Sequence, residues 1–374
     1  MKIVYADHSA TSYPKSSKAI EAVTYSLAKG IGNPSRSAYS ASMPGTKMIF
    51  SARQRSADFL SVNDSSRIIF TSGATLGLNI AIFGLLKRGD HVIVSSFEHN
   101  SAMRPLSYLQ KEGVIELSIL HCPDGRVDIE QFKSMIKENT KLIVFIHGSN
   151  ATGHIFPIEE LAKHKGNAFF LSDACQTAGY LPLKPSEWGI DLLAFSAHKF
   201  LEAPQGIGIL YLSPNVNIKP FIYGGTGSVS ESDDMPDFLP DSLEAGSCNV
   251  PGIAGLHAVL DDFKYDTEYL KKLTVTLAGK LSEIDDLRVV SGIADADFLP
   301  IVSVVPAKMS PRDLALKLDK EYSIMARAGL HCAPWAHKTM GTFETGMLRF
   351  SFGKDNTEEE ILYIADSVKK ILCN

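Results

Sequence analysis

Residues 191–199 read Asp-Leu-Leu-Ala-Phe-Ser-Ala-His-Lys, and this stretch decides the fold class. The run 191–195 is short and mostly apolar, and polar residues follow it directly. Continuous apolar runs of this kind are typical of strands buried on both faces, as in a mainly parallel sheet covered by helices. Such a strand would present Lys199 at its carboxyl end, where open α/β sheets place their ligands.

Similar apolar runs alternate with helical patterns between residues 65 and 215. They predict strands over 67–71, 91–94, 141–147, 168–172 and 208–212. The alternation predicts an α/β fold with a mainly parallel sheet between layers of helices. The runs do not give the order of the strands.

The later part of the chain indicates a second, smaller domain, because 374 residues exceed what one small core normally holds. Residues 223–241 are rich in Gly, Ser, Asp and Pro and predict an exposed loop. Asn249-Val250-Pro251 is a helix-start signal, and we place the change of domain near 250–265. Thr357-Glu358-Glu359-Glu360 is a capping-box pattern that opens a final amphipathic helix.

Composition narrows the class of protein. Apolar residues make up 45% and charged residues 21%, the net charge is −5, and no basic run is present. These values argue against nucleic acid or an anionic membrane as the main partner. We expect no secretory signal and no membrane span, since no long apolar stretch occurs. The five cysteines form no C-x-x-C pair, which predicts free thiols in a reducing cytoplasm and no metal site.

Two polar residues at predicted strand ends suggest a carbonyl cofactor. Lysine forms Schiff bases with such cofactors, although Lys199 could equally be a surface lysine after a strand. The run 168–172 ends at Asp173, with Gln176 three residues later. A pyridine-type cofactor needs a carboxylate against its ring nitrogen, whereas the alternative for Asp173 is a helix N-cap or turn residue. Together the two residues favour pyridoxal 5'-phosphate (PLP).

Two further turns could complete such a site. Residues 71–77, Thr-Ser-Gly-Ala-Thr-Leu-Gly, lead into a helical pattern whose N-terminus would favour an anion. This turn matches neither the P-loop nor the dinucleotide pattern. Glu98-His99-Asn100 follows a predicted strand, and an imidazole there could stack on a flat cofactor or be an ordinary loop residue.

The chain as a whole resembles the class V branch of fold-type I PLP enzymes, in particular cysteine desulfurases and selenocysteine lyases. The resemblance implies a large domain over 12–255 with a mainly parallel seven-stranded sheet, and a smaller α+β domain over 1–11 and 256–374. The matching stretches, in chain order, are 5–11, 33–36, 71–79, 98–100, 147–150, 173–176, 196–199, 244–249, 327–334 and 347–353.

The resemblance also implies a role for each matching residue. Lys199 would carry the cofactor as a Schiff base, Asp173 would pair with the pyridine nitrogen, and His99 would stack on the ring. Gln176 would bond the phenolic oxygen. The cofactor phosphate would be held by Ala74 (through its backbone), Thr75, Ser196 and His198, and by Ser247 of a second copy, which implies a homodimer with shared active sites. The substrate would be bound by Asn150, Arg327 and Arg349.

Residues 327–334, Arg-Ala-Gly-Leu-His-Cys-Ala-Pro, resemble the active-site cysteine loop of group II desulfurases. The resemblance implies that Cys332 accepts sulfur from L-cysteine as a persulfide and leaves L-alanine. The alternative for Cys332 is a structural cysteine, and Cys175 and Cys248 are rival thiols.

Two departures from the family pattern put the substrate in question: Glu202-Ala203 stands where relatives usually carry a Gly before the Pro, and Ala74 lacks a hydroxyl. Selenocysteine lyase or another C–S lyase is the first rival function, so L-selenocysteine is a second candidate substrate. A class V aminotransferase acting on another amino acid and a non-catalytic PLP-binding protein are further rivals. A sulfur-acceptor protein is an expected partner, and residues 223–241 are the expected docking loop.

Overall fold

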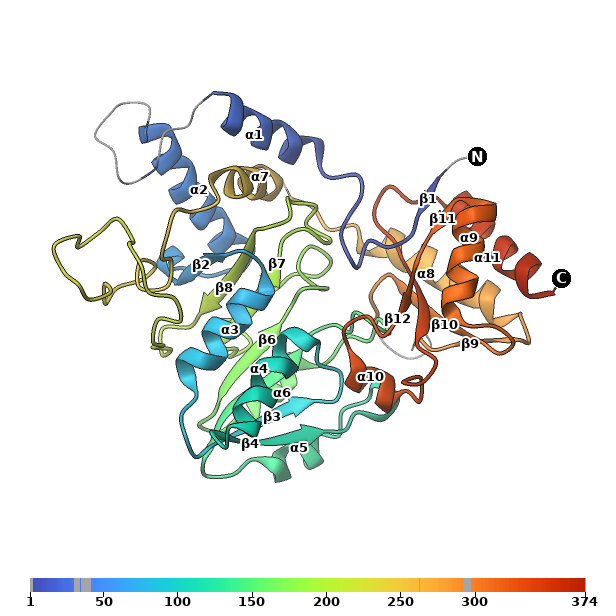
Figure 1. Cartoon of the computed structure of the whole chain (residues 1–374), viewed down its shortest axis with the longest axis horizontal. Helices are drawn as coiled ribbons and strands as arrows, with labels where there is room; N and C mark the ends of the chain where they lie inside the picture. The colour runs from blue at the N-terminus through green and yellow to red at the C-terminus, as the bar shows by residue number, and fades with distance from the viewer. Residues whose placement is uncertain (1–2, 30–33, 35–41, 262, 292–296, 374) are drawn as a thin grey trace.

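The computed structural model describes residues 3–29, 34, 42–261, 263–291 and 297–373. A seven-stranded sheet forms the centre of the larger body (Figure 1). Every neighbouring pair of its strands is parallel except the two pairs that β8 makes. From edge to edge the strands are β2 (Ile68–Thr71), β8 (Gly208–Leu212), β7 (Leu192–Ser196), β6 (Phe169–Asp173), β5 (Thr140–Ile146), β3 (Asp90–Ser95) and β4 (Ile115–Leu120).

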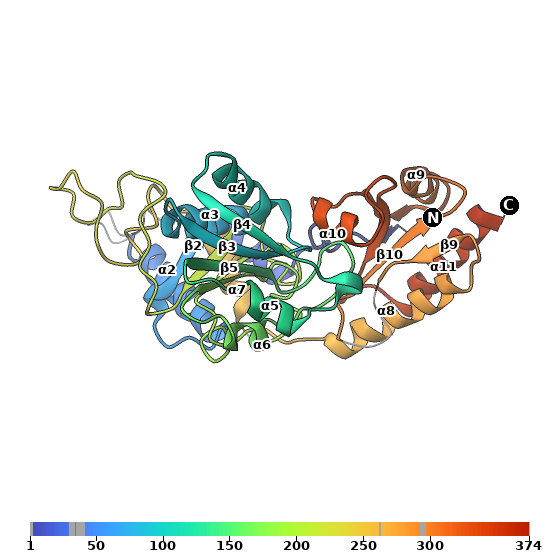
Figure 2. The same ribbon diagram turned by 90° about the horizontal axis from the view of Figure 1, so that it is seen from below.

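Successive side chains of these strands enter two hydrophobic clusters, one on each face of the sheet. In β5, Ile143 and Phe145 belong to one cluster and Leu142 and Val144 to the other. Burial on both faces explains the unbroken apolar runs in the sequence. Figure 2 shows α3 and α4 on one side of the sheet and α5 and α6 on the other. The covering helices are α3 (Ala74–Leu85) and α4 (Asn100–Lys111), and opposite them α1 (Ser17–Ala28), α2 (Met43–Phe59), α5 (Ile129–Met135), α6 (Ile158–Lys163) and α7 (Val250–Leu260).

The strand β4 was missed by the apolar runs because it lies at the edge of the sheet. Its Glu116 is exposed and its middle residues are only partly buried, so its sequence is not continuously apolar. The predicted runs 168–172 and 191–195 also stop one residue short of the ends of their strands. Asp173 and Ser196 are the last residues of β6 and β7, and do not begin the following loops.

The smaller body contains a four-stranded antiparallel sheet in the order β12 (Arg327–Gly329), β13 (Met347–Ser351), β10 (Ile301–Pro306) and β9 (Leu287–Val289). The chain's first strand, β1 (Val4–Tyr5), pairs in parallel with β11 (Ile324–Met325) in this body. One hydrophobic cluster contains residues of both these sheets and of the helices α8 (Thr267–Ser282), α9 (Pro311–Tyr322) and α11 (Glu358–Cys373). The helix α10 (Pro334–Thr339) instead packs against the core of the larger body.

The predicted helix starts are present with their caps. The Oδ1 of Asn249 accepts a hydrogen bond from Gly252 N at 3.0 Å, which opens α7. Before α11, Thr357 Oγ1 accepts from Glu360 N and Glu360 Oε2 accepts from Thr357 N, both at 3.2 Å. This reciprocal pair is a capping box. Residues 223–241 contain no helix or strand, as predicted.

No helix within the described ranges is long and apolar enough to cross a lipid bilayer. The fold class expected from the sequence is confirmed: a mainly parallel seven-stranded sheet covered by helices, with a smaller α+β body.

Candidate active site

A cavity of about 220 Å³ lies where the carboxyl ends of β3, β5, β6 and β7 face the small sheet. It brings together segments that are far apart in the sequence and contains most of the predicted site residues. Those lining it are Ala74, Thr75, His99, Asn150, Asp173, Gln176, Ser196, His198, Lys199, Arg327 and Arg349. The matching stretch 33–36 lies outside the described residues except for Pro34.

Asp173 and Lys199 come from neighbouring parallel strands. Asp173 is 3% exposed, and its Oδ1 accepts a hydrogen bond from Cys175 N at 2.9 Å, which fixes the carboxylate at the end of β6. Lys199 lies in the turn after β7, where its carbonyl accepts from Glu202 N at 2.8 Å. An amine and a carboxylate therefore converge on one cavity from adjacent strand ends.

His99 is the N-cap residue of α4, and its hydrogen bonds define its tautomer. Its Nδ1 accepts from Ser101 N at 3.1 Å, so the proton of the neutral ring is on Nε2. Burial, together with the nearby charges of Lys199 and Arg327, lowers the pKa of His99 to about 4, while Asp173 opposes that shift. The ring is therefore neutral at physiological pH, and His99 lines the cavity.

The N-terminus of α3 opens onto one end of the cavity. Ser196 Oγ accepts a hydrogen bond from Ala74 N at 2.9 Å, so hydroxyl and amide lie side by side there. A Cβ at position 208 would lie 2.7 Å from the Cα of Gly73, which has φ +148°, so this close approach of β8 requires glycine. Free N–H groups at a helix N-terminus favour an anion through both hydrogen bonds and the helix dipole.

The N-terminal segment holds the turn that carries Lys199. The carbonyl of His198 accepts from Ser12 N at 3.0 Å and from Lys15 Nζ at 2.7 Å. Burial lowers the pKa of Lys15 to about 8. Glu202, which departs from the family pattern, does not line the cavity; its carboxylate pairs with Lys354 at 2.5 Å. The position of Glu202 thus reflects a contact with the smaller body.

Two arginines from neighbouring strands face the cavity. Arg327 and Arg349 are directly opposite each other in the β12–β13 ladder, an arrangement of like charges that is unfavourable without an anion. Arg349 is buried, its Nη2 lies 2.5 Å from Asp7 Oδ1, and its Nη1 donates to Asn150 O at 2.8 Å. Its Nε has no partner among the described residues. This end of the cavity can bind a carboxylate.

Cys332 lies beside the cavity and does not line it. Ala333 N donates to Leu330 O at 2.8 Å, and the two residues between them, His331 and Cys332, have φ of 49° and 56°. Left-handed conformations at such residues store about 1–3 kcal/mol each and cluster at functional sites. The Cys332 side chain is exposed at the tip of this turn, and its carbonyl accepts from Asn100 N at 2.8 Å.

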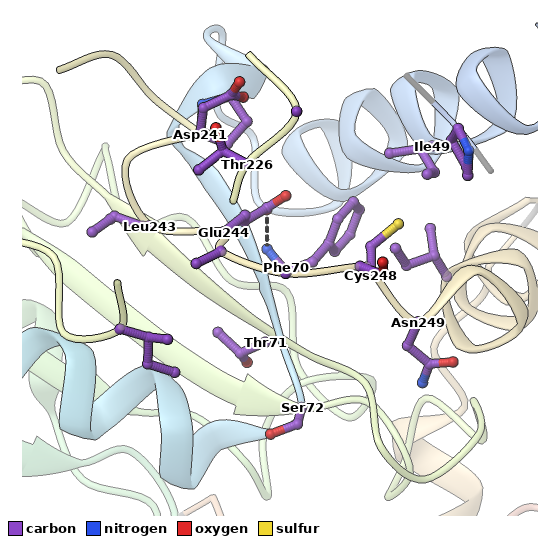
Figure 3. A pocket seen from close by; sticks show the side chains of 18 of the residues that line it. Ile49, Phe70, Thr71, Ser72, Thr226, Asp241, Leu243, Glu244, Cys248 and Asn249 are labelled. Atoms are coloured by element: carbon purple, nitrogen blue, oxygen red, sulfur yellow. Dashed lines mark hydrogen bonds between the residues drawn. The ribbon is translucent and has the colours of Figure 1, made fainter. Parts of the chain in front are cut away.

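The rival thiols differ from Cys332 in their surroundings. Cys175 lines the cavity, but burial and Asp173 raise the pKa of its thiol to about 12. A thiol in that state is a poor nucleophile. Cys248 and Ser247 line a different cavity of about 510 Å³, which lies between α2, β2 and the segment 240–249 (Figure 3). In this cavity the backbone N–H of Phe70 donates a hydrogen bond to the Glu244 carboxylate. Ser247 is therefore not brought to the chain's own Lys199.

The donor set of the first cavity fits PLP. Three residues that line it each have a buried polar atom without a partner among the described residues: Gln176 Oε1, Asn150 Oδ1 and Arg349 Nε. Buried polar groups normally have partners, so this cluster indicates a polar ligand. A lysine, a carboxylate, a flat neutral imidazole and a helix N-terminus match an aldehyde, a pyridine nitrogen, an aromatic ring and a phosphate respectively.

The family model described as "Aminotransferase class-V" matches residues 4–364. This chain belongs to the class-V aminotransferase family. PLP is the cofactor of this family, and the matched region of the class-V aminotransferase model runs from β1 into α11.

Relatives from several organisms match the chain over nearly its full length. A "Probable cysteine desulfurase" of Methanothermobacter thermautotrophicus is 31% identical over 98% of this chain and 94% of its own length. "Cysteine desulfurase IscS" of Clostridium botulinum is also 31% identical, over 99% of this chain and 94% of its own. The solved structure of a cysteine desulfurase from Thermococcus onnurineus superposes with a TM-score of 0.91 at 28% identity, covering 99% of this chain and 95% of that one.

Two residues that line the cavity, Ser9 and Ser101, were given no role from the sequence, although each lies within or next to a matching stretch. Asp7 lies within the matching stretch 5–11, but its pairing with Arg349 has no local signal, because the two residues are 342 positions apart in the chain.

Proposed function

We propose that this chain is a PLP-dependent cysteine desulfurase, which converts L-cysteine to L-alanine and transfers the sulfur to Cys332 as a persulfide. The observation that carries the proposal is the single cavity shared by Lys199, Asp173 and Arg349, with the exposed thiol of Cys332 on the turn beside it. Full-length relatives that bear the name cysteine desulfurase support it.

In this proposal, Lys199 holds the cofactor and later moves the α-proton of the substrate. When bound, PLP supplies a carbonyl for the substrate amine and an electron sink for Cα. Asp173 would keep a proton on the ring nitrogen, and the neutral imidazole of His99 would stack on the ring. Gln176 would hydrogen-bond to the phenolic oxygen. The backbone of Ala74 and the side chains of Thr75, Ser196 and His198 would hold the phosphate.

Substrate binding and sulfur transfer involve the opposite side of the cavity. Arg349, with Asn150 and Arg327, binds the substrate carboxylate through charge-assisted hydrogen bonds. The Cys332 thiolate attacks the substrate sulfur and the Cβ–S bond breaks. Its electron pair stays with carbon, which takes up a proton to give alanine. His331 connects the cavity to Cys332, the next residue in the chain. It lines the cavity, and its carbonyl accepts a hydrogen bond from Asn150 Nδ2 at 2.7 Å.

We also propose a homodimer with shared active sites, in which Ser247 of each copy reaches the phosphate site of the other. The support is the place of Ser247 on a second cavity, outside its own chain's PLP site. The division into 12–255 and 1–11 with 256–374 is part of the proposal. Its support is that Val4 and Ala6 pack in the same hydrophobic cluster as helices α8, α9 and α11. Helix α7 packs on the large sheet up to its end at Leu260, so we move the second boundary from 255 to the end of this helix. We place the enzyme in the cytoplasm, where an exposed catalytic thiol stays reduced.

A selenocysteine lyase is the second candidate, because the Cys332 side chain does not line the cavity. Selenium leaves carbon more readily than sulfur, so this reaction can proceed without the thiol.

The deciding experiment is anaerobic incubation of the PLP-loaded protein with L-cysteine and a reductant, followed by assay of alanine and sulfide. The control variant Cys373→Ala changes another exposed thiol, and it should form as much alanine and sulfide as the wild type. Cys332→Ala should form neither from L-cysteine. A PLP-loaded wild type that forms neither product from L-cysteine but forms alanine from L-selenocysteine would replace the first proposal with the second.

A further inference from the structure

Glu98 is a fully buried carboxyl group next to the proposed cofactor site, since its partner Ile146 and its neighbour His99 line the cavity. It lies between the end of β3 and His99, with 0% exposure. Its Oε1 accepts hydrogen bonds from Ser95 Oγ at 2.5 Å and from Ile146 N at 2.7 Å. Its Oε2 has no hydrogen-bond partner in the part of the chain that the structure describes.

The two hydrogen bonds tie together the strand ends that position His99 and Asp173. Ile146 is the last residue of β5 and is the register partner of Asp173 in β6. The following residue, His147, donates its N–H to the Asp173 carbonyl at 2.9 Å. Glu98 therefore links the start of α4, which carries His99, to the strand next to Asp173.

The charges around Glu98 do not favour its ionised form. Among the described residues no lysine, arginine or histidine forms a salt bridge with it, and the ionisable groups that face it are Asp173 from β6 and Cys122 from the segment after β4. Burial raises the pKa of Glu98 to about 8, and the negative charge of Asp173 adds to the shift, while the hydrogen bonds from Ser95 and Ile146 oppose it. A buried carboxyl without a cation takes up a proton because the charged form is poorly solvated.

We propose that Glu98 is a positioning residue that stays protonated at neutral pH, so that Asp173 remains the single ionised carboxylate at the cofactor site. Its neutral carboxyl keeps His99 and Asp173 in register while adding no second negative charge. The roles of His99 and Asp173 in this inference rest on the proposed function, whereas the protonation state of Glu98 does not.

The first test uses the full chain without cofactor. Urea unfolding is measured from about pH 5 to about pH 8 for wild type, Glu98→Gln and the exposed control Glu138→Gln. Unfolding exposes Glu98 to water, where it ionises, so wild type should lose stability relative to Glu98→Gln as the pH rises. The ratio of their unfolding constants should change by roughly tenfold for each pH unit in this window. A ratio that stays flat, as expected for Glu138→Gln, would overturn the proposal.

The second test measures PLP binding to the cofactor-free chain. The neutral isostere Glu98→Gln should bind PLP within about threefold of wild type, whereas Glu98→Ala, which loses both hydrogen bonds, should bind roughly tenfold more weakly. Equal weakening by both variants would mean that the negative charge is required and would refute the protonated state.

Should Glu98→Gln fail to fold, infrared spectra of the wild type between about pH 6 and about pH 9 give the same answer. Loss of a protonated-carboxyl band in that interval supports the proposal, and its absence overturns it. Either result stands even where the alanine assay fails.

Discussion

Replacing Asp7 with asparagine removes the counter-charge of Arg349. The Arg349 side chain is 1% exposed, and its Nη2 lies 2.5 Å from Asp7 Oδ1. Asparagine retains an acceptor oxygen at that place, so the hydrogen bond can persist. The guanidinium charge, however, is left buried beside Arg327, its cross-strand neighbour.

Breaking a buried ion pair by removing one partner costs about 3–5 kcal/mol of stability. We expect a value near the low end, about 3 kcal/mol, because the Asp7 side chain is 21% exposed and water can approach the pair. A ligand carboxylate can take the place of Asp7. L-alanine, which has the carboxylate of the substrate, should therefore stabilise the PLP-loaded Asp7→Asn variant more than it stabilises the wild type.

Urea unfolding with and without L-alanine measures both effects, and Glu359→Gln in the exposed first turn of α11 is the matched control. The reasoning is refuted if Asp7→Asn is as stable as this control to within about 0.5 kcal/mol, the usual effect of a surface substitution. It is equally refuted if L-alanine stabilises wild type and variant by the same amount.

Three further predictions concern stability. Glu244→Gln should cost about 2–3 kcal/mol in urea unfolding, because Arg53 donates to this carboxylate at 2.6 and 2.8 Å and keeps its charge when the acid is lost. Gly353→Ala should cost about 1–3 kcal/mol in the same assay, since the added Cβ would lie 2.3 Å from His8 Nδ1. Burial lowers the pKa of His8 and His99 to about 4, so the unfolded chain binds protons that the folded chain does not. Their contribution to stability should be complete above about pH 6.5 and be lost as the pH falls toward about 4, seen as a falling urea midpoint.

The two substitutions have control variants, and each of the three predictions has an outcome that would contradict it. Glu231→Gln removes an exposed carboxyl, and a loss equal to that of Glu244→Gln would show that the Arg53 pair is not stabilising. Gly279→Ala meets no atom within 4 Å, so equal stability of the two alanine variants would contradict the predicted clash. A urea midpoint that stays constant between about pH 6.5 and about pH 4 would contradict the pH prediction.

The fold could be predicted where burial leaves a continuous pattern. Strands covered on both faces, such as β5 and β7, are unbroken apolar runs, and the caps at Asn249 and Thr357 are local signals. The edge strand β4 could not be found in this way, since Glu116 and Ser118 interrupt its apolar residues.

The site could be predicted in part, because parallel strands bring their carboxyl ends to one edge of the sheet. His99, Asp173 and Lys199 follow or end such strands and do line one cavity. The order of the strands, which makes β6 and β7 neighbours, depends on long-range pairing and has no local signal. The burial of Glu98 was missed for the same reason, since its partner Ile146 is 48 residues away.

The pairing of β1 with the smaller body has a consequence for biosynthesis. Arg349 is translated 342 residues after Asp7. At about 5–20 residues per second, a ribosome needs roughly 20–70 seconds to cover that distance. The large sheet, whose strands all lie between residues 68 and 212, can form meanwhile. The side of the cavity that contains Arg327 and Arg349 is therefore assembled last, and a nascent chain has the strand ends of the large sheet before it has this arginine pair.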